Sequence, residues 1–111
     1  MKLEPKVIYA GNGAQEYVRL LGGPPESVSM RSGVVTLQPG NSVGKHTTEA
    51  YEELLVILEG SGAFILTDGR QLEMKVEHVL YCPPFTEHDV LNTGTTPLRY
   101  IYIVAKAERQ T

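Results

Sequence analysis

The chain has 111 residues and a formal net charge of −3, from 10 Lys and Arg against 13 Asp and Glu. This length suffices for one domain with a buried core and leaves no room for a second, so a single domain over residues 1–111 is expected. A composition that is 41% apolar and 21% charged is typical of a folded globular protein and excludes a disordered chain.

The charge pattern and the apolar runs argue against nucleic-acid and membrane partners. No cluster of Lys and Arg forms the basic stripe that binding to phosphate backbones requires. The longest aliphatic run, residues 54–58, is five residues, whereas a bilayer-crossing helix needs about twenty. The residues after Met1 lack the apolar stretch of a secretory signal, and Cys82 is the single cysteine, so a cytoplasmic location is expected.

Glycines and prolines divide the chain into short segments rich in Val, Ile, Leu, Tyr and Thr, which is typical of successive β-strands. In chain order the predicted strands are 7–9, 17–21, 28–37 with a bulge at Gly33, 53–59, 63–66, 71–76, 79–82, 88–91 and 98–105. Residues 14–21 are also compatible with a short helix. Many short strands without longer helical segments predict an all-β antiparallel sandwich or barrel.

Two features refine this prediction. Residues 71–76 alternate apolar and polar side chains, so Leu72, Met74 and Val76 are expected on a buried face. The dipeptide Asp68-Gly69 favours a tight turn and predicts a hairpin with the preceding strand.

Residues 54–58 and 98–105 are apolar on both strand faces. One face can look into a barrel, but the other needs cover from another sheet, from the N-terminal strands or from a second copy of the chain. A homodimer is therefore expected.

Three side chains are candidates for chemistry. His46 shares a strand face with Thr48, whereas Glu53 has the opposite parity and needs a bend near Ala50-Tyr51 to face the same way. His88 follows two prolines that end one strand and begin the next. Two imidazoles and one carboxylate form a donor set that holds a divalent transition metal, such as Fe, Mn, Ni, Co or Zn, with positions left open.

These spacings resemble the two motifs of the cupin superfamily. The first is Gly40, five residues, His46, one residue, Thr48, four residues, Glu53, six residues and Gly60; the second is Pro83, four residues, His88, three residues and Asn92. The resemblance implies an antiparallel double-sheet jelly-roll barrel with a buried pocket. It also implies His46, Glu53 and His88 as metal ligands.

The sequence departs from the family pattern at three places. Thr48 stands where the family carries its second metal-binding histidine, and a hydroxyl is a far poorer metal donor than imidazole. Thr48 is therefore expected to line the pocket or to hydrogen-bond a coordinated group rather than ligate. Phe85 and the pair Glu77-His78 replace the glycine and the Gly-Asp pair of the motif, which affects turn geometry.

The remaining candidates have structural interpretations. Glu49, Glu52 and His78 are expected to be solvated or structural, and Cys82 to be a small buried apolar residue. Asn92 can cap the turn that follows it or contact a ligand. The tyrosines at positions 51, 81, 100 and 102 are expected in the core or along the pocket, with Tyr51 a pocket residue.

The function stays open between two classes. Small cupins include dioxygenases, isomerases, epimerases, decarboxylases, lyases and non-catalytic binding proteins, so the fold alone does not name a reaction. The first hypothesis is a metal-dependent enzyme acting on a small polar organic molecule in the pocket. The alternative is a non-catalytic module that binds or senses a small molecule, with a weak or lost metal site.

Overall fold

The computed structural model describes residues 2–107, and this part of the chain contains nine β-strands and no α-helix. The strands are β1 (Tyr17–Gly22), β2 (Arg31–Leu37), β3 (His46–Thr47), β4 (Tyr51–Glu59), β5 (Ser61–Leu66), β6 (Gln71–Lys75), β7 (Val79–Cys82), β8 (Glu87–Leu91) and β9 (Leu98–Lys106). Within the same residues there is no helix of the length and apolarity that crossing a bilayer requires.

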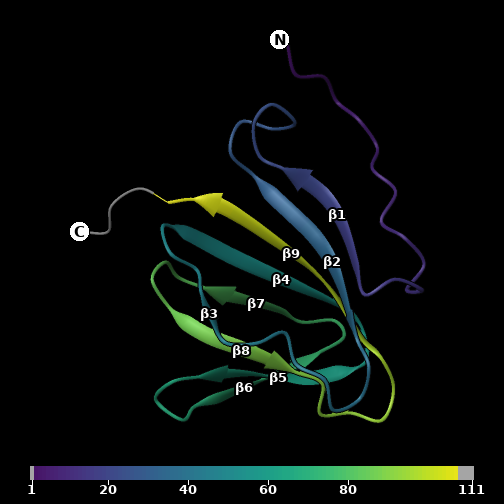
Figure 1. Cartoon of the computed structure of the whole chain (residues 1–111), viewed down its shortest axis with the longest axis vertical. Coiled ribbons are helices and arrows are strands. Elements are labelled where there is room, and N and C mark those ends of the chain that lie inside the picture. Colours follow the sequence, from purple (N-terminus) through teal and green to yellow (C-terminus); the bar gives the residue numbers. More distant parts are fainter. Residues whose placement is uncertain (1, 108–111) are drawn as a thin grey trace.

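The strands form two antiparallel sheets that face each other (Figure 1). The larger sheet has the order β1-β2-β9-β4-β7, and the smaller sheet has the order β3-β8-β5-β6. Strands far apart in sequence are therefore neighbours, as when β9 lies between β2 and β4. This crossover pattern of two packed sheets confirms the predicted all-β jelly-roll barrel.

The core lies between the two sheets. It consists of the inward-facing residues Leu55, Ile57, Phe64, Met74, Leu80, Cys82, Val90, Leu98 and Tyr100. Each of these side chains is buried because strand alternation directs it away from solvent. The burial of Cys82, at 1% exposure, confirms its role as a small apolar core residue.

Several local predictions were wrong. Residues 7–9 lie in an irregular exposed segment instead of a strand. Residues 17–22 form β1, which confirms the strand predicted over 17–21, so the alternative of a short helix over 14–21 was wrong. The bulge falls in β1 between Arg19 and Leu21 instead of at Gly33. Because β6 is an edge strand, Leu72 and Val76 are 40% and 45% exposed, and only Met74 of the alternating set is buried.

Three turn residues in or between the two motifs have a backbone with positive φ. Gly60 joins β4 to β5 with a φ of 79°, and a Cβ there would collide with the carbonyl oxygen of Pro97. Glu77 and Phe85, which both stand where the family motif has glycine, adopt φ values of 74° and 53°. Both therefore occupy the left-handed region that glycine prefers.

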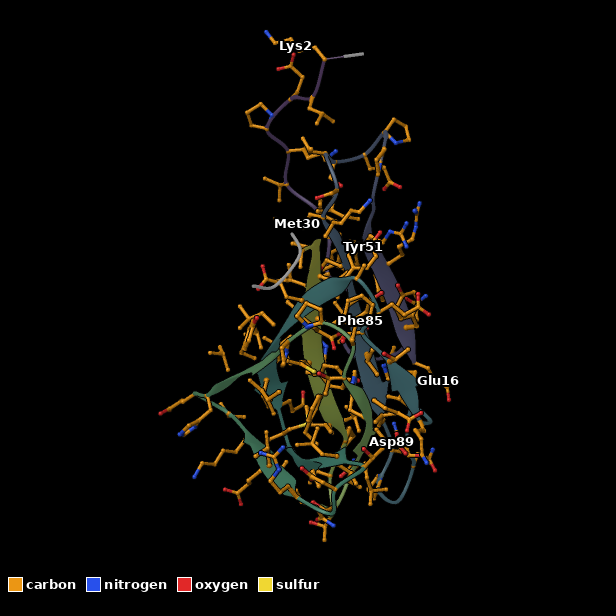
Figure 2. All side chains as sticks on the ribbon, turned by 90° about the vertical axis from the view of Figure 1, so that its left-hand side faces the viewer. Lys2, Glu16, Met30, Tyr51, Phe85 and Asp89 are labelled. Atoms are coloured by element: carbon orange, nitrogen blue, oxygen red, sulfur yellow. The ribbon has the colours of Figure 1, made fainter. Side chains whose placement is uncertain are left out.

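The N-terminal segment runs along the outside of the larger sheet and then extends away from it, with Lys2 at its far end (Figures 1 and 2). It is attached where Arg99 of β9 donates hydrogen bonds from Nη2 to the carbonyl oxygens of Ala10 and Gly11. Val7 and Tyr9 on this segment are 100% and 76% exposed, so the segment contributes little to the core.

Candidate functional site

A pocket of about 440 Å³ lies inside the barrel, between the two sheets. Its walls include the apolar side chains Val35, Val43, Leu55, Val90 and Val104, and its polar groups are described in turn below. Its volume is within the range of about 300–1,000 Å³ that is usual for small-molecule sites. The barrel therefore has a preformed space for a ligand.

The two histidines lie side by side on adjacent strands. His46 of β3 is the direct cross-strand partner of His88 of β8, and their rings meet edge to face with centroids 4.3 Å apart. Each Nδ1 lies close to a backbone carbonyl oxygen, of Gly44 at 2.8 Å and of Thr86 at 2.9 Å. Because a carbonyl can only accept, both Nδ1 atoms carry hydrogen, and the Nε2 atoms are the ones left for other partners.

Glu53 approaches His88 from the opposite sheet. Its Oε1 lies 3.4 Å from Nε2 of His88, and the two side chains are 12% and 1% exposed. His88 also stacks on Phe64, with centroids 4.6 Å apart, and lies 3.9 Å from the sulfur of Cys82. The imidazole is therefore fixed on all sides, whereas His46 is exposed at the mouth of the pocket.

The protonation of His88 follows from these contacts. Burial alone would lower its pKa, but hydrogen bonding with Cys82 and Glu53 and to the carbonyl of Thr86 outweighs burial and raises the pKa to about 10. Burial and the Glu53 charge also raise the pKa of Tyr100 on the neighbouring strand. Without a metal, these contacts therefore favour the protonated form of the His88 ring that faces Glu53.

A turn between β3 and β4 brings Glu53 to the pocket, as the parity of the sequence required. The amide of Tyr51 donates to the carbonyl of Thr48 at 3.1 Å, and Glu49 within this turn has a φ of 52°. The change of direction places Tyr51, Glu53 and Leu55 on the pocket face of β4. Glu49 and Glu52 are exposed, as expected.

Thr48 lines the pocket, but its hydroxyl is already used. It donates to the carbonyl of Pro83 at 2.8 Å and accepts from the amide of Thr86 at 3.0 Å. These bonds connect the end of β3 to the loop before β8. Thr48 therefore positions the loop that carries His88, and its oxygen is a poor candidate for a metal ligand.

The types of donor atom suit a metal, but the arrangement of the three side chains does not yet form a complete site. Two donor atoms about 2.1 Å from one cation are about 3.0–3.4 Å apart, which matches the 3.4 Å between His88 Nε2 and Glu53 Oε1. Across residues 2–107, however, no three His, Cys, Asp or Glu side chains are grouped closely enough to hold a metal as they stand. The chemistry of the donors fits a divalent transition metal, and binding would require these side chains to move closer together.

Two predicted residues lie elsewhere. Asn92 is buried but is not part of the pocket wall, because its side chain bonds to the backbone of Leu37, Gly94 and Thr96 and so caps the turn. Tyr81 is 56% exposed on the outer face, where its hydroxyl donates to Glu52. Placing Tyr81 in the core or pocket was therefore wrong.

Sequence reasoning missed the polar end of the pocket that is formed by β1 and β2. Arg31 and Tyr17 line the pocket, and the hydroxyl of Tyr17 lies 2.6 Å from that of Tyr102, which was expected in the core or along the pocket. None of these residues belongs to the recognised motifs. The signal was the parity of β2, which places Arg31 on the same face as Val35.

Known proteins with the same features identify the family. A family model described as a cupin domain matches residues 33–104. An oxalate-binding protein of Thermotoga maritima is 34% identical over 68 residues, and an uncharacterized protein of Methanocaldococcus jannaschii is 34% identical over 73 residues. These alignments include 61% and 66% of this chain and only 55% and 56% of the relatives, so the match extends over about half the length of each relative.

A solved structure of a cupin family protein has the same fold. A cupin family protein from Methanocaldococcus jannaschii, with a double-stranded β-helix fold, superimposes with a TM-score of 0.77 at 20% identity. The alignment covers 95% of this chain and 94% of that one. At this identity the likeness concerns the fold alone, whereas the family model covers well over half of the residues. The chain therefore belongs to the cupin domain family.

Proposed function

We propose that this barrel binds a small carboxylate-bearing organic molecule in its pocket, next to a divalent transition metal held by His46, Glu53 and His88. The observation that carries the proposal is the contact between His88 and Glu53, with His46 adjacent, at the wall of a pocket of about 440 Å³. Oxygen and nitrogen donors suit Fe, Mn, Ni, Co or Zn.

The protein residues have separate roles in this proposal. The carbonyls of Gly44 and Thr86 fix the ring orientations of His46 and His88, which leaves Nε2 as the donor atom on each ring. Glu53 supplies the negative charge. A bound metal would act as a Lewis acid toward a ligand oxygen, or as an oxygen-activating centre if it were iron.

The choice of a carboxylate ligand has support from one relative. The Thermotoga maritima protein, 34% identical over 68 residues, is named an oxalate-binding protein. Within the part of the chain that the structure describes, Glu53 is the one carboxylate that lines the pocket, and it is next to His88, so an anionic ligand would meet little repulsion there. The first hypothesis for activity is a metal-dependent reaction of this bound acid.

A second candidate is a binding or sensing module without turnover. Two observations favour it. His88 and Glu53 already satisfy each other without a metal, and Thr48 supplies no donor at the place of the missing imidazole. Among the described residues, the polar groups that line the pocket also include no acid or base beyond the proposed ligands, the tyrosines and Arg31.

Elemental analysis tests the metal half of the proposal. Protein purified without added metal is expected to carry close to one equivalent of transition metal, and a His88→Ala variant is expected to carry little. Exposed His78→Ala, which changes a histidine on the turn before β7, is the matched control and should keep its metal. Equal metal in the wild type and in His88→Ala would contradict the ligand assignment.

Turnover assays separate the two candidates. Oxygen uptake and product formation are followed for oxalate and a panel of small organic acids, sugars and phenols with the metal-loaded protein. Turnover that His88→Ala abolishes supports an enzyme. Saturable binding of an acid with no turnover across the panel supports the binding module instead.

A further inference from the structure

Arg31 stands out because, among residues 2–107, it is the one Arg or Lys side chain that lines the pocket. It begins β2 and pairs with Val104 of β9, whose partner on the other side is Glu53 of β4. Arg31 and Glu53 are thus two strands apart on one sheet face, with Cα atoms about 10 Å apart. The cation therefore lies at a separate position from the histidines.

Arg31 is an exposed residue at the edge of the pocket, and its side chain lies close to two neighbours. Its guanidinium carbon lies 5.3 Å from the centre of the Tyr51 ring, a cation–π contact. On the other side the backbone of Gly23 is so close that a Cβ there would be 3.2 Å from Nε. The ion pairs found within residues 2–107 do not involve Arg31, so its donors are available to an anion.

Two tyrosines complete this end of the pocket. The hydroxyls of Tyr17 and Tyr102 lie 2.6 Å apart, and their rings stack over Gly33, where a Cβ would meet both rings at less than 3 Å. Gly33 is two residues from Arg31 on the same face of β2. The two hydroxyl groups have two hydrogens, and the hydrogen bond between them needs only one. The second hydrogen can therefore be donated to a ligand.

The wall beyond these groups is apolar, with Val35, Val43, Leu55, Val90 and Val104 as its aliphatic members. A two-carbon diacid would leave this surface uncovered in a pocket of about 440 Å³. An apolar group placed there would stabilise the complex in proportion to the apolar surface that it removes from water. The pocket thus combines one anchored cation with a large apolar wall.

We propose that Arg31, Tyr17 and Tyr102 form an anion subsite, and that the ligand is an organic acid larger than oxalate. Its carboxylate pairs with Arg31 and the tyrosine hydroxyls, and its apolar body lies against the valines and Leu55. This inference rests on the proposed function, because it names the class of molecule that occupies the same pocket. The metal assignment is independent of it, since Arg31 is not one of the proposed ligands.

The test compares two probes of the same shape, 3-phenylpropanoate and its neutral amide, by isothermal titration calorimetry. The wild type is expected to bind the acid at least about tenfold more tightly than the amide, because a charged hydrogen bond is stronger than a neutral one. Arg31→Gln should remove this preference, and Arg31→Lys should restore part of it. Arg70→Gln, the same change on the β5–β6 turn away from the pocket, should leave it intact.

A second variant guards against a folding defect in Arg31→Gln. Tyr102→Phe keeps the ring and removes the hydroxyl, and it should weaken binding of the acid about threefold or more without changing binding of the amide. Equal binding of acid and amide by the wild type, or an unchanged preference in Arg31→Gln, would overturn the inference. Binding of oxalate without binding of 3-phenylpropanoate would also overturn the inference, and it would still support the proposed binding of a small carboxylate.

The metal measurement separates this inference from the proposed function. A protein that takes up metal through His88 and binds neither probe contradicts the anion subsite and leaves the metal site in place. A protein that carries no metal but distinguishes acid from amide through Arg31 supports the anion subsite and contradicts the metal half of the proposed function.

Discussion

Replacing Glu53 by Gln tests the pairing of His88 and Glu53 in the metal-free protein. The atoms lie 3.4 Å apart and the side chains are 12% and 1% exposed. At an effective dielectric constant of about 20, the Coulomb attraction of two full charges at this distance is about 5 kcal/mol. Desolvation offsets part of this, and Gln keeps an acceptor for Nε2, so we expect the free energy of unfolding to fall by about 2–3 kcal/mol at pH 6.

The pH dependence of this loss has a definite sign. The pKa of His88 is raised from its ordinary value of 6.5 to about 10 in the folded protein, and the ring is faced by Glu53, Cys82 and His46. Stability from such a group is fully present below pH 6.5 and is lost as the pH rises through about 10. The difference between wild type and Glu53→Gln should therefore be largest at pH 6 and shrink toward pH 10.

Urea denaturation followed by circular dichroism at pH 6, 8 and 10, with a chelator present, measures this difference. Glu52→Gln, an exposed change on the neighbouring position of β4, is the control and should alter the free energy of unfolding by less than about 0.5 kcal/mol. A loss below this value for Glu53→Gln, or a difference that grows with pH, would refute the pairing of an imidazolium with a carboxylate.

Three further predictions concern other parts of the fold. Thr48→His should raise metal affinity at least about tenfold in a chelator competition, because imidazole replaces a hydroxyl; unchanged affinity in a variant as stable as the wild type would contradict a metal at this site. Glu77→Gly should raise the free energy of unfolding by about 0.5–1 kcal/mol by relieving the φ of 74°, whereas Glu77→Ala should not; a loss with Gly would disprove the strain. Light scattering should give twice the mass of one chain, and Tyr81→Glu on the exposed outer face should give the mass of one chain.

The sequence predicted the fold well where a local signal decided the structure. The alternation of side chains and the Asp68-Gly69 turn predicted the hairpin of β5 and β6, in which Gly69 has a φ of 93°. Sequence-based prediction failed where a strand depends on its pairing with residues that are distant in the sequence. Residues 7–9 have strand composition but find no partner strand, and the two-residue β3 is defined by its pairing with β8 rather than by its own sequence.

Some residues of the candidate site were predicted from the sequence, and others were missed. Motif spacing led to His46, Glu53 and His88, and the structure brings these three side chains into one neighbourhood, although ligation itself stays a prediction. Arg31 was missed because it lies outside the motifs, at the first residue of a strand whose register was not known. The parity of β2 puts Arg31 on the face of Val35, but that this face lines the pocket follows from the pairing of β2 with β9.

X-ray absorption spectroscopy of the metal-loaded protein is the most direct test of the proposed site. The spectrum should show the multiple-scattering pattern of two imidazoles together with oxygen donors, and His46→Ala should reduce the pattern to that of one imidazole. An oxygen-only environment, or two imidazoles that persist in His46→Ala, would contradict a metal held by His46, Glu53 and His88.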